Sequence, residues 1–327
     1  MKAILMRDYG SVDVLSYEEI ATPGPNADEV LIKVEAAGVN YADVMLRKGI
    51  YLIKPETPFV PGFEVVGTIE ELGATVKGLQ VGQRVVAFLQ TGGYAEYAVA
   101  SHQEVFTLPE NLEAGKALAL AVQGWTAFGL LQDLKPDRTV LIQAAAGGVG
   151  VLLVQLAKIR GAKKVIGTAS TPEKLEIIKQ LGAEVAINYS ESDWTEQIAK
   201  VTDNKGVDLL IESVGGEVGG QSFKCLAHNG EIIIYGQSSD EGFQLLSSDV
   251  FFKGLTIKGY LVRDETPENL SKYTKELMKL LDRGRLSILV TKFALEKAAD
   301  AQRVLETRKT VGKVILLPFP EVSGAKG

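Results

Sequence analysis

The chain has 327 residues, which is too long for one compact core and suits two domains of ordinary size. Its 35 Lys and Arg residues against 41 Asp and Glu residues give a formal net charge of −6, which does not indicate a surface for nucleic acid or anionic membranes. No apolar run is long enough to cross a bilayer, and a single cysteine, Cys225, excludes an internal disulfide.

Two further features of the composition favour a reducing, cytoplasmic setting. Charged residues follow Met1 too closely for a secretory signal. One cysteine and two histidines cannot build a Cys-rich zinc site. We therefore expect Cys225 to be a small buried residue, and His102 and His228 to be surface or capping residues.

The first 110 residues predict a β-rich domain. Short apolar segments such as 29–36 and 84–88 are separated by Gly and Pro turn signals. From about residue 112 the hydrophobic period changes, and residues 112–131 have a helical pattern with small residues inside.

Strands and helices then alternate, which predicts a doubly wound parallel sheet of the Rossmann type. The expected strands are 139–143, 163–168, 184–187, 207–211, 230–235 and 255–261, and the expected helices are 149–160, 172–181, 192–202, 217–227 and 267–283. The tail ends in a strand at 312–317, so we expect it to fold back onto the N-terminal domain, with residues 321–327 frayed. The predicted fold class is α/β, with a β-rich domain over 1–122 and 264–327 and a dinucleotide-binding domain over 123–263.

Small residues fill the turn between the strand at 139–143 and the helix that follows it. This strand–turn–helix context suits a dinucleotide pyrophosphate, because the helix N-terminus offers unpaired N–H groups and the positive end of its dipole. Gly147 would let the backbone approach the phosphates, and Gly150 would let the helix pack closely on the strand; the first glycine of the strict pattern is Ala145 here. The expected cofactor-binding residues of this turn are Ala146, Gly147, Gly148, Val149 and Gly150.

The end of the next strand indicates which cofactor is preferred. A site that prefers NAD places a carboxylate about 20 residues after the glycines, to hold the ribose 2′-hydroxyl, and Ala169 stands there. Ser170 can donate a hydrogen bond and Lys174 can supply a positive charge to a 2′-phosphate. The sequence therefore predicts an NADP(H) pocket; the alternative for Lys174 is a solvated position on a helix that begins after Pro172.

A β-rich domain with an inserted Rossmann domain resembles the medium-chain dehydrogenase/reductase superfamily, over nearly the whole chain. Four segments resemble its zinc-free quinone oxidoreductase branch, which includes ζ-crystallin and alkenal reductases; they are 37–43, 47–51, 61–64 and 144–150. The resemblance implies a GroES-like catalytic domain, NADPH as the cofactor, a small-molecule acceptor and a homodimer. The strands at 230–235 and 255–261 would lie near the sheet edge, where a second subunit could pair.

A metal site is not expected. Zinc-containing relatives have a cysteine near Ala37 and a Gly-His-Glu triplet, whereas here the triplet contains Phe63, which cannot bind zinc. Oxidising an unactivated alcohol needs a Lewis acid. We therefore expect hydride delivery to an acceptor that already stabilises negative charge, a quinone or an α,β-unsaturated carbonyl. The alternatives are enoyl-thioester reduction and NADPH binding with little turnover.

The residues that the resemblance places near the nicotinamide and substrate are Asn40, Tyr51, Gln123 and Thr126. Tyr51 could hydrogen-bond a developing oxyanion and assist protonation; its alternative is packing against Pro55 or Pro58. Asp43 also resembles a family position, where we favour a helix cap or turn.

At the adenosine end, the family places a tyrosine at Tyr189, and Arg308 resembles an arginine that closes over the 2′-phosphate. The alternatives are an exposed strand-end aromatic and a helix C-terminal cation. Lys313 is similar to a residue near the cofactor, or is a strand-edge charge. Two strand-end loops would pass the nicotinamide ribose and carboxamide, unless they are only turns; their expected cofactor-binding residues are Ser213, Val214, Tyr235 and Gln237.

Overall fold

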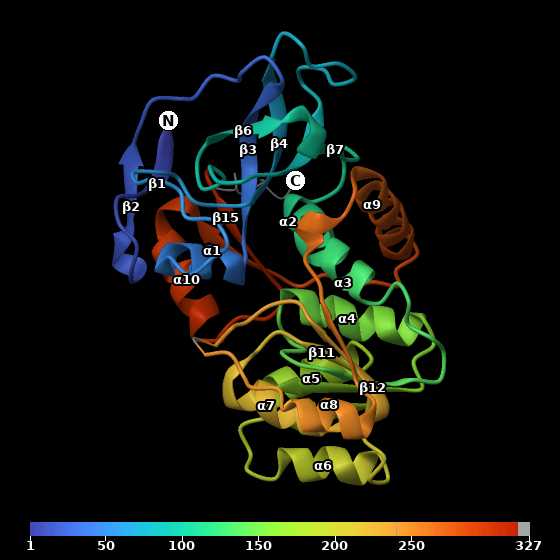
Figure 1. Ribbon diagram of the computed structural model, residues 1–327. Coiled ribbons are helices and arrows are strands. Elements are labelled where there is room, and N and C mark those ends of the chain that lie inside the picture. The colour runs from blue at the N-terminus through green and yellow to red at the C-terminus, as the bar shows by residue number, and fades with distance from the viewer. Residues whose placement is uncertain (240, 320–327) are drawn as a thin grey trace, which may run out of the picture. The chain divides into compact units, whose positions relative to one another are not determined.

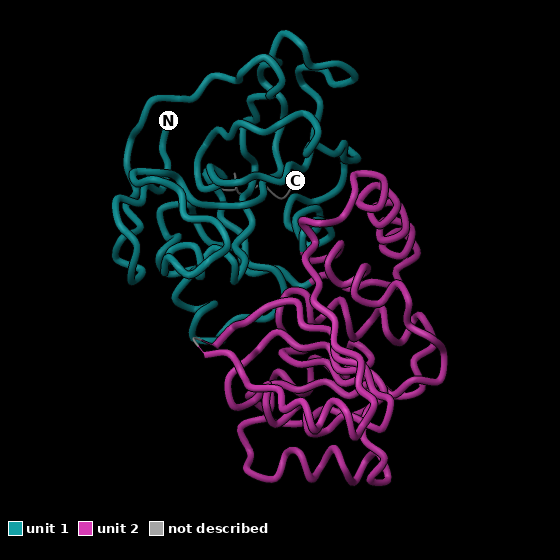
Figure 2. The backbone as a smooth tube through the Cα atoms, viewed as in Figure 1, with its two compact units in different colours: residues 1–122, 289–327 teal, residues 123–288 magenta. Residues whose placement is uncertain are grey.

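The computed structural model describes residues 1–239 and 241–319, and its backbone divides into two units, which have different colours in Figure 2. Unit 1 contains residues 1–122 and 289–327, and unit 2 contains residues 123–288. The first boundary has the expected position, but the second lies after residue 288 and not after 263. The reason is that the helix over Pro267–Asp282 packs on unit 2, where the Trp125 indole N–H donates to the Thr274 hydroxyl at 2.8 Å.

Unit 1 is built on a seven-stranded sheet in the order β14-β15-β3-β4-β5-β7, with β6 also paired to β3 (Figure 1). Its strands are β3 (Glu29–Val39), β4 (Glu64–Leu72), β5 (Arg84–Phe88), β6 (Tyr97–Ser101), β7 (Val105–Thr107), β14 (Val290–Ala294) and β15 (Lys313–Leu317), and a separate pair is formed by β1 (Lys2–Met6) and β2 (Leu15–Glu19). Its helices are α1 (Tyr41–Lys48), α2 (Ala114–Leu118) and α10 (Ala298–Glu306). The expected return of the tail is confirmed, because β15 pairs antiparallel with β3, with Ile315 opposite Gly38.

Unit 2 is a six-stranded sheet in the order β10-β9-β8-β11-β12-β13, and all its strand pairs are parallel. Its strands are β8 (Thr139–Ile142), β9 (Lys164–Ala169), β10 (Val185–Asn188), β11 (Val207–Glu212), β12 (Leu226–Ile234) and β13 (Thr256–Gly259). Its helices are α3 (Gly124–Leu130), α4 (Gly148–Ile159), α5 (Pro172–Gln180), α6 (Trp194–Val201), α7 (Gly216–Lys224), α8 (Ser247–Lys253) and α9 (Pro267–Asp282). The predicted α/β class with a doubly wound parallel sheet is confirmed.

The observed elements depart from the expected ones around β12, which begins four residues before the expected strand at 230–235. The strand is irregular: β12 pairs with β11 at Leu226, and the register shifts before the pairing resumes at Glu231. Asn229 has a φ of +59°, which is the left-handed conformation that an asparagine tolerates. Helix α7 therefore ends at Lys224, three residues earlier than expected.

Cys225 caps the end of α7 and packs, partly buried, against the core of unit 2. Burial raises the pKa of its thiol to about 11. His102 lies in a short 3₁₀ turn, where its Nδ1 is 2.8 Å from the Asp28 carbonyl oxygen, in agreement with a surface or capping role. Within residues 1–239 and 241–319, none of the helices combines the length and apolar character that crossing a bilayer requires. The expected frayed segment 321–327 lies outside the described residues.

Candidate functional site

The turn after β8 leads directly into α4, whose N-cap is Gly147. The Gly147 N–H donates to the Ala144 carbonyl at 2.8 Å, and the Ala145 N–H donates to Thr168 on β9 at 2.9 Å. Ala144 has a φ of +49°, a conformation that costs a residue with a side chain roughly 1–2 kcal/mol. The turn is therefore tightly fixed at the carboxyl edge of the sheet, where ligands bind in open α/β folds.

Two glycines of this turn are required by their surroundings. A Cβ atom at Gly150 would collide with the Ala144 carbonyl, so this glycine lets α4 approach the turn, whereas the expected contact was with the strand. A Cβ at Gly148 would collide with the side-chain amide of Gln123. The first turn of α4 and the Gln123 amide are therefore in direct contact.

Gln123 and Thr126 come from an irregular helical stretch. Residues Ala119–Gln123 form a π-helix with a non-helical residue at Ala121, and α3 begins at the next residue. Short π-helical segments within helices are frequent at functional sites. The structure places Gln123 at the start of α4, and Thr126 lies buried on the first turn of α3.

The expected adenosine end brings several predicted residues together. Ala169 is the last residue of β9, and the Tyr189 N–H donates to its carbonyl at 3.2 Å, which ties the end of β10 to that of β9. Ser170 follows, and the Thr171 hydroxyl caps α5 by accepting from the Lys174 N–H at 3.4 Å. Ser170, Lys174 and Tyr189 therefore all lie where β9 and β10 end.

Sequence reasoning missed one residue of the strand-end loops, Glu212. Its side chain is fully buried, and its Oε1 accepts from the N–H groups of Val214 at 2.8 Å and Gly215 at 3.0 Å. Burial raises the pKa of Glu212, although these two backbone bonds oppose the shift. The sequence does contain an indication of this residue, because Glu212 is an acid at the end of the apolar strand β11. A carboxyl group buried there needs hydrogen-bond partners.

The two expected cofactor loops are joined to each other. The Ser238 N–H donates to the Ser213 carbonyl at 2.9 Å, and the Ser239 N–H donates to the Val214 carbonyl at 2.8 Å. Gln237 donates to the Ser239 carbonyl at 3.2 Å. Burial raises the pKa of Tyr235 to about 12, although a hydrogen bond with Ser213 opposes the shift. All four predicted loop residues therefore belong to one hydrogen-bonded pair of loops.

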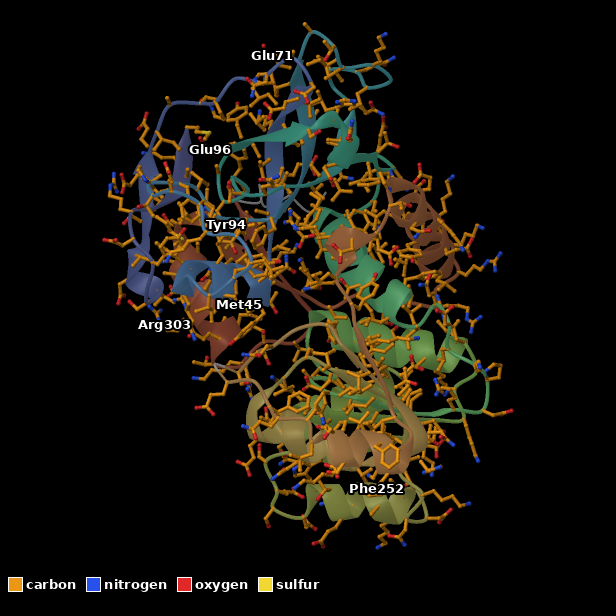
Figure 3. The ribbon with its side chains drawn as sticks, in the orientation of Figure 1. Met45, Glu71, Tyr94, Glu96, Phe252 and Arg303 are labelled. Atoms are coloured by element: carbon orange, nitrogen blue, oxygen red, sulfur yellow. The ribbon has the colours of Figure 1, made fainter. Side chains whose placement is uncertain are left out.

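In unit 1, Asn40 is the N-cap residue of α1, and Asp43 completes a capping box. The Asp43 carboxylate accepts from the Asn40 backbone N–H at 2.7 Å, so the predicted capping role of Asp43 is confirmed. Burial raises the pKa of Asp43 to about 7. Tyr94, labelled in Figure 3, is also buried, and burial with the nearby Asp43 carboxylate raises the pKa of its hydroxyl well above the usual value.

The side chain of Asn40 joins a buried ion pair. Lys313 and Glu64 form a salt bridge with both side chains 0% exposed, so Lys313 is not the strand-edge charge of the alternative interpretation. Asn40 donates to Glu64 Oε1 at 2.7 Å and accepts from Lys313 at 3.1 Å. Gly38 provides the space for this cluster, because a Cβ there would collide with the Glu64 carboxylate.

Tyr51 follows α1 in a loop, with its ring packed on Phe63 at 5.2 Å between centroids. Phe63 is therefore one packing partner of the Tyr51 ring. Arg308 belongs to unit 1 and lies just after α10, with a φ of +57°. Its N–H donates to the Leu305 carbonyl at 3.0 Å, which closes the end of that helix.

Two family models match the chain. The alcohol dehydrogenase GroES-like domain matches residues 26–110, and the zinc-binding dehydrogenase domain matches residues 148–283. The quinone oxidoreductase of Sus scrofa is 35% identical over 324 residues, which cover 97% of this chain and 98% of that protein. The chain belongs to the quinone oxidoreductase family. This family lies within the medium-chain dehydrogenase/reductase superfamily, so the predicted resemblance is confirmed.

Solved structures of quinone oxidoreductases share the whole fold. The Escherichia coli quinone oxidoreductase complexed with NADPH has a TM-score of 0.92 at 30% identity, over 97% of this chain and 100% of that one. The Pseudomonas syringae quinone oxidoreductase has a TM-score of 0.91 at 31% identity, over 97% and 99%. A more distant neighbour, CurK enoyl reductase, has a TM-score of 0.84 at 28% identity, over 97% and 98%. These likenesses confirm the GroES-like and Rossmann architecture.

Proposed function

We propose that this member of the quinone oxidoreductase family is a metal-free, NADPH-dependent enzyme of a reducing cytoplasm that reduces quinones or activated α,β-unsaturated carbonyls. The observation that carries the proposal is the end of β9, where Ala169 stands at the position of an NAD site's carboxylate. Ser170 is the next residue, Lys174 lies on the first turn of α5, and the Tyr189 N–H donates to the Ala169 carbonyl. An acid at this position would repel a 2′-phosphate, whereas a lysine attracts it.

The residues around the glycine turn fit a dinucleotide. Helix α4 begins at Gly148 and presents its first N–H groups and its positive dipole end at the carboxyl edge of the sheet. The E. coli quinone oxidoreductase was solved as a complex with NADPH, which supports the same cofactor here.

Bound NADPH would supply a hydride, and the protein would supply orientation and hydrogen bonds. Gln123 and Thr126 would contact the nicotinamide, and the loops at 213–216 and 235–239 would hold its ribose and carboxamide. Asn40 and Tyr51 would act on the acceptor, with Tyr51 donating a hydrogen bond to the oxygen on which charge develops. A proton would then come from Tyr51 or from solvent.

Phe63 supports the absence of a catalytic metal. It occupies the position of the histidine in the Gly-His-Glu triplet, and its buried ring packs on Tyr51. A quinone or an enone does not need a Lewis acid, because the acceptor itself stabilises the negative charge that hydride transfer creates. Turnover should therefore persist in the presence of a strong chelator, and its loss would contradict a metal-free mechanism.

A panel of acceptors tests the proposed reaction. NADPH oxidation would be followed optically with a naphthoquinone, an alkenal and crotonyl-thioester, with NADH as the matched cofactor. We expect the quinone or the alkenal to give the highest kcat/KM. The likeness to CurK enoyl reductase favours a second candidate, and the thioester as the best acceptor would establish it. Tight NADPH binding without turnover of any acceptor would favour a binding protein.

We also propose that the protein is a homodimer that pairs through β13. This strand is the edge of the unit 2 sheet, and all four of its residues are exposed. The preceding helix α8 exposes Phe251 at 76% and Phe252 at 74%. Phe252 is labelled in Figure 3. An exposed sheet edge beside apolar surface favours pairing with a second copy.

The mass in solution, measured by light scattering, tests the dimer. We expect a dimer for the unchanged chain and a monomer for Phe252→Asp. Val81→Asp, which changes a side chain that is 62% exposed in unit 1, is the matched control and should stay dimeric. A monomeric unchanged chain would contradict the proposal.

A further inference from the structure

The fold of unit 1 does not require charged side chains at the positions of its buried ion pair. Lys313 on β15 and Glu64 on β4 are joined across two elements that a pair of apolar side chains could join as well. Burying two charges costs desolvation energy that their attraction often only balances. An ion pair in such a place therefore calls for another explanation.

The contacts of this pair converge on Asn40. Glu64 Oε1 accepts from the amide nitrogen of Asn40 at 2.7 Å, and the Lys313 ammonium donates to the amide oxygen at 3.1 Å. An ammonium only donates and a carboxylate only accepts, so the two charges permit one of the two orientations of the Asn40 amide and oppose the other.

The backbone of Asn40 is fixed separately. Its N–H donates to the Asp43 carboxylate within the capping box of α1. Glu64 Oε2 also accepts from the Val122 N–H at 3.4 Å, one residue before Gln123. The same carboxylate thus contacts Asn40 and the residue that precedes Gln123, a proposed nicotinamide contact.

We infer that Lys313 and Glu64 are positioning residues that set the direction of the Asn40 amide for the acceptor. This inference rests on the proposed function, in which Asn40 acts on the acceptor. It assigns to the ion pair the role of orienting the Asn40 amide, which the proposed NADPH-binding residues of unit 2 do not perform. Hydrogen-bond donors contribute most to catalysis when they are held in place before the reaction.

Steady-state kinetics of single and double variants test the inference. Lys313→Met should lower kcat about 10-fold or more. It should leave the KM for NADPH within about twofold, because the proposed NADPH site lies at the carboxyl edge of the unit 2 sheet. In the Asn40→Ala background, Lys313→Met should have little further effect, because its route to the acceptor is already lost. Losses that multiply in the double variant would overturn the inference.

Two variants serve as controls. Lys292 lies on β14, the strand next to β15, and forms a surface ion pair with Glu113. Lys292→Met removes this pair and should leave kcat unchanged. Lys313→Arg retains the charge and the donors and should recover most of the activity. If Lys313→Met does not fold, Glu64→Gln carries the same test, because it retains the shape of the side chain and removes the ion pair.

A spectroscopic measurement separates this inference from the proposed function. The side-chain amide ¹H–¹⁵N signals of Asn40, identified by their loss in Asn40→Ala, should move in Glu64→Gln and Lys313→Met and stay in place in Lys292→Met. This outcome would support positioning even if no acceptor is turned over. Unchanged Asn40 signals in both cluster variants would overturn it, whatever the enzyme reduces.

Discussion

One buried polar cluster in each unit can be compared, and the two clusters are of different kinds. In unit 1, Asp43, Glu64 and Lys313 form a cluster of ionisable groups that is closed to solvent. In unit 2, a neutral chain of hydrogen bonds crosses the sheet, in which Thr168 donates to Gln143 and Gln143 donates to Ser222. A neutral chain fixes the strand ends at little desolvation cost, so packing accounts for it. The charged cluster is costly to bury, which is why we infer that it has a role in function.

The largest expected effect is on the free energy of unfolding. Lys313→Met leaves the Glu64 carboxylate buried without its counter-charge and should destabilise the protein by about 3–5 kcal/mol. Gln143→Leu, in the neutral chain of unit 2, should cost about 1–3 kcal/mol. Urea unfolding of both variants measures the difference. Equal losses would remove the distinction between the units.

A pairwise replacement sharpens this result. Glu64→Leu combined with Lys313→Met should recover most of the stability that Lys313→Met loses, because neither charge of the ion pair is then left without its partner. The double variant should nevertheless stay impaired in kcat. Full activity in a stable double variant would show that the charges serve neither stability nor function.

The second prediction concerns pH. The pKa of Asp43 is raised from 3.8 to about 7, so the folded state holds a proton that the unfolded state releases. Its contribution to stability is therefore complete below about pH 4 and is lost as pH rises through 7, by roughly 2–3 kcal/mol between pH 5 and pH 8. Asp43→Asn keeps an oxygen for the Asn40 N–H and should flatten this slope. The same slope in both proteins, measured by urea unfolding at several pH values, would contradict the assignment.

The third prediction concerns Lys174, the cation that unit 2 would offer to a 2′-phosphate. Lys174→Ala in unit 2 should lower the ratio of kcat/KM for NADPH over NADH about 10-fold, which corresponds to about 1.4 kcal/mol. Lys179→Ala is the matched control on the same helix, where Lys179 pairs with Glu176 at 2.9 Å, and it should leave the ratio unchanged. An unchanged ratio in Lys174→Ala would remove this residue from the pocket.

The smallest effect is expected at Arg308 in unit 1. Its φ of +57° suits glycine, so Arg308→Gly should stabilise the protein by about 1 kcal/mol and lower the preference for NADPH. Thermal unfolding and the same cofactor ratio would be measured together. A variant that gains stability without losing preference would show that Arg308 does no more than end α10.

Local patterns predicted most of unit 2 and little of the charged cluster. The strands and helices from β8 to β11 follow continuous apolar and amphipathic periods, and the Asp43 cap depends on residues three positions apart. The Glu64–Lys313 pair joins residues 249 positions apart, so no local pattern could predict it. Helix α8 was not predicted because Phe251 and Phe252 point outward, which removes the buried stripe of an ordinary helix.

The chain's one thiol gives unit 2 a native reporter. Since Cys225 is partly buried and its pKa is about 11, almost none of it is thiolate at neutral pH, and alkylating reagents should modify the folded protein slowly. The labelling rate then measures how often α7 and the adjoining start of β12 come apart. Because the sequence has no second cysteine, that rate can be followed by mass alone, with and without NADPH, and no engineered probe is needed.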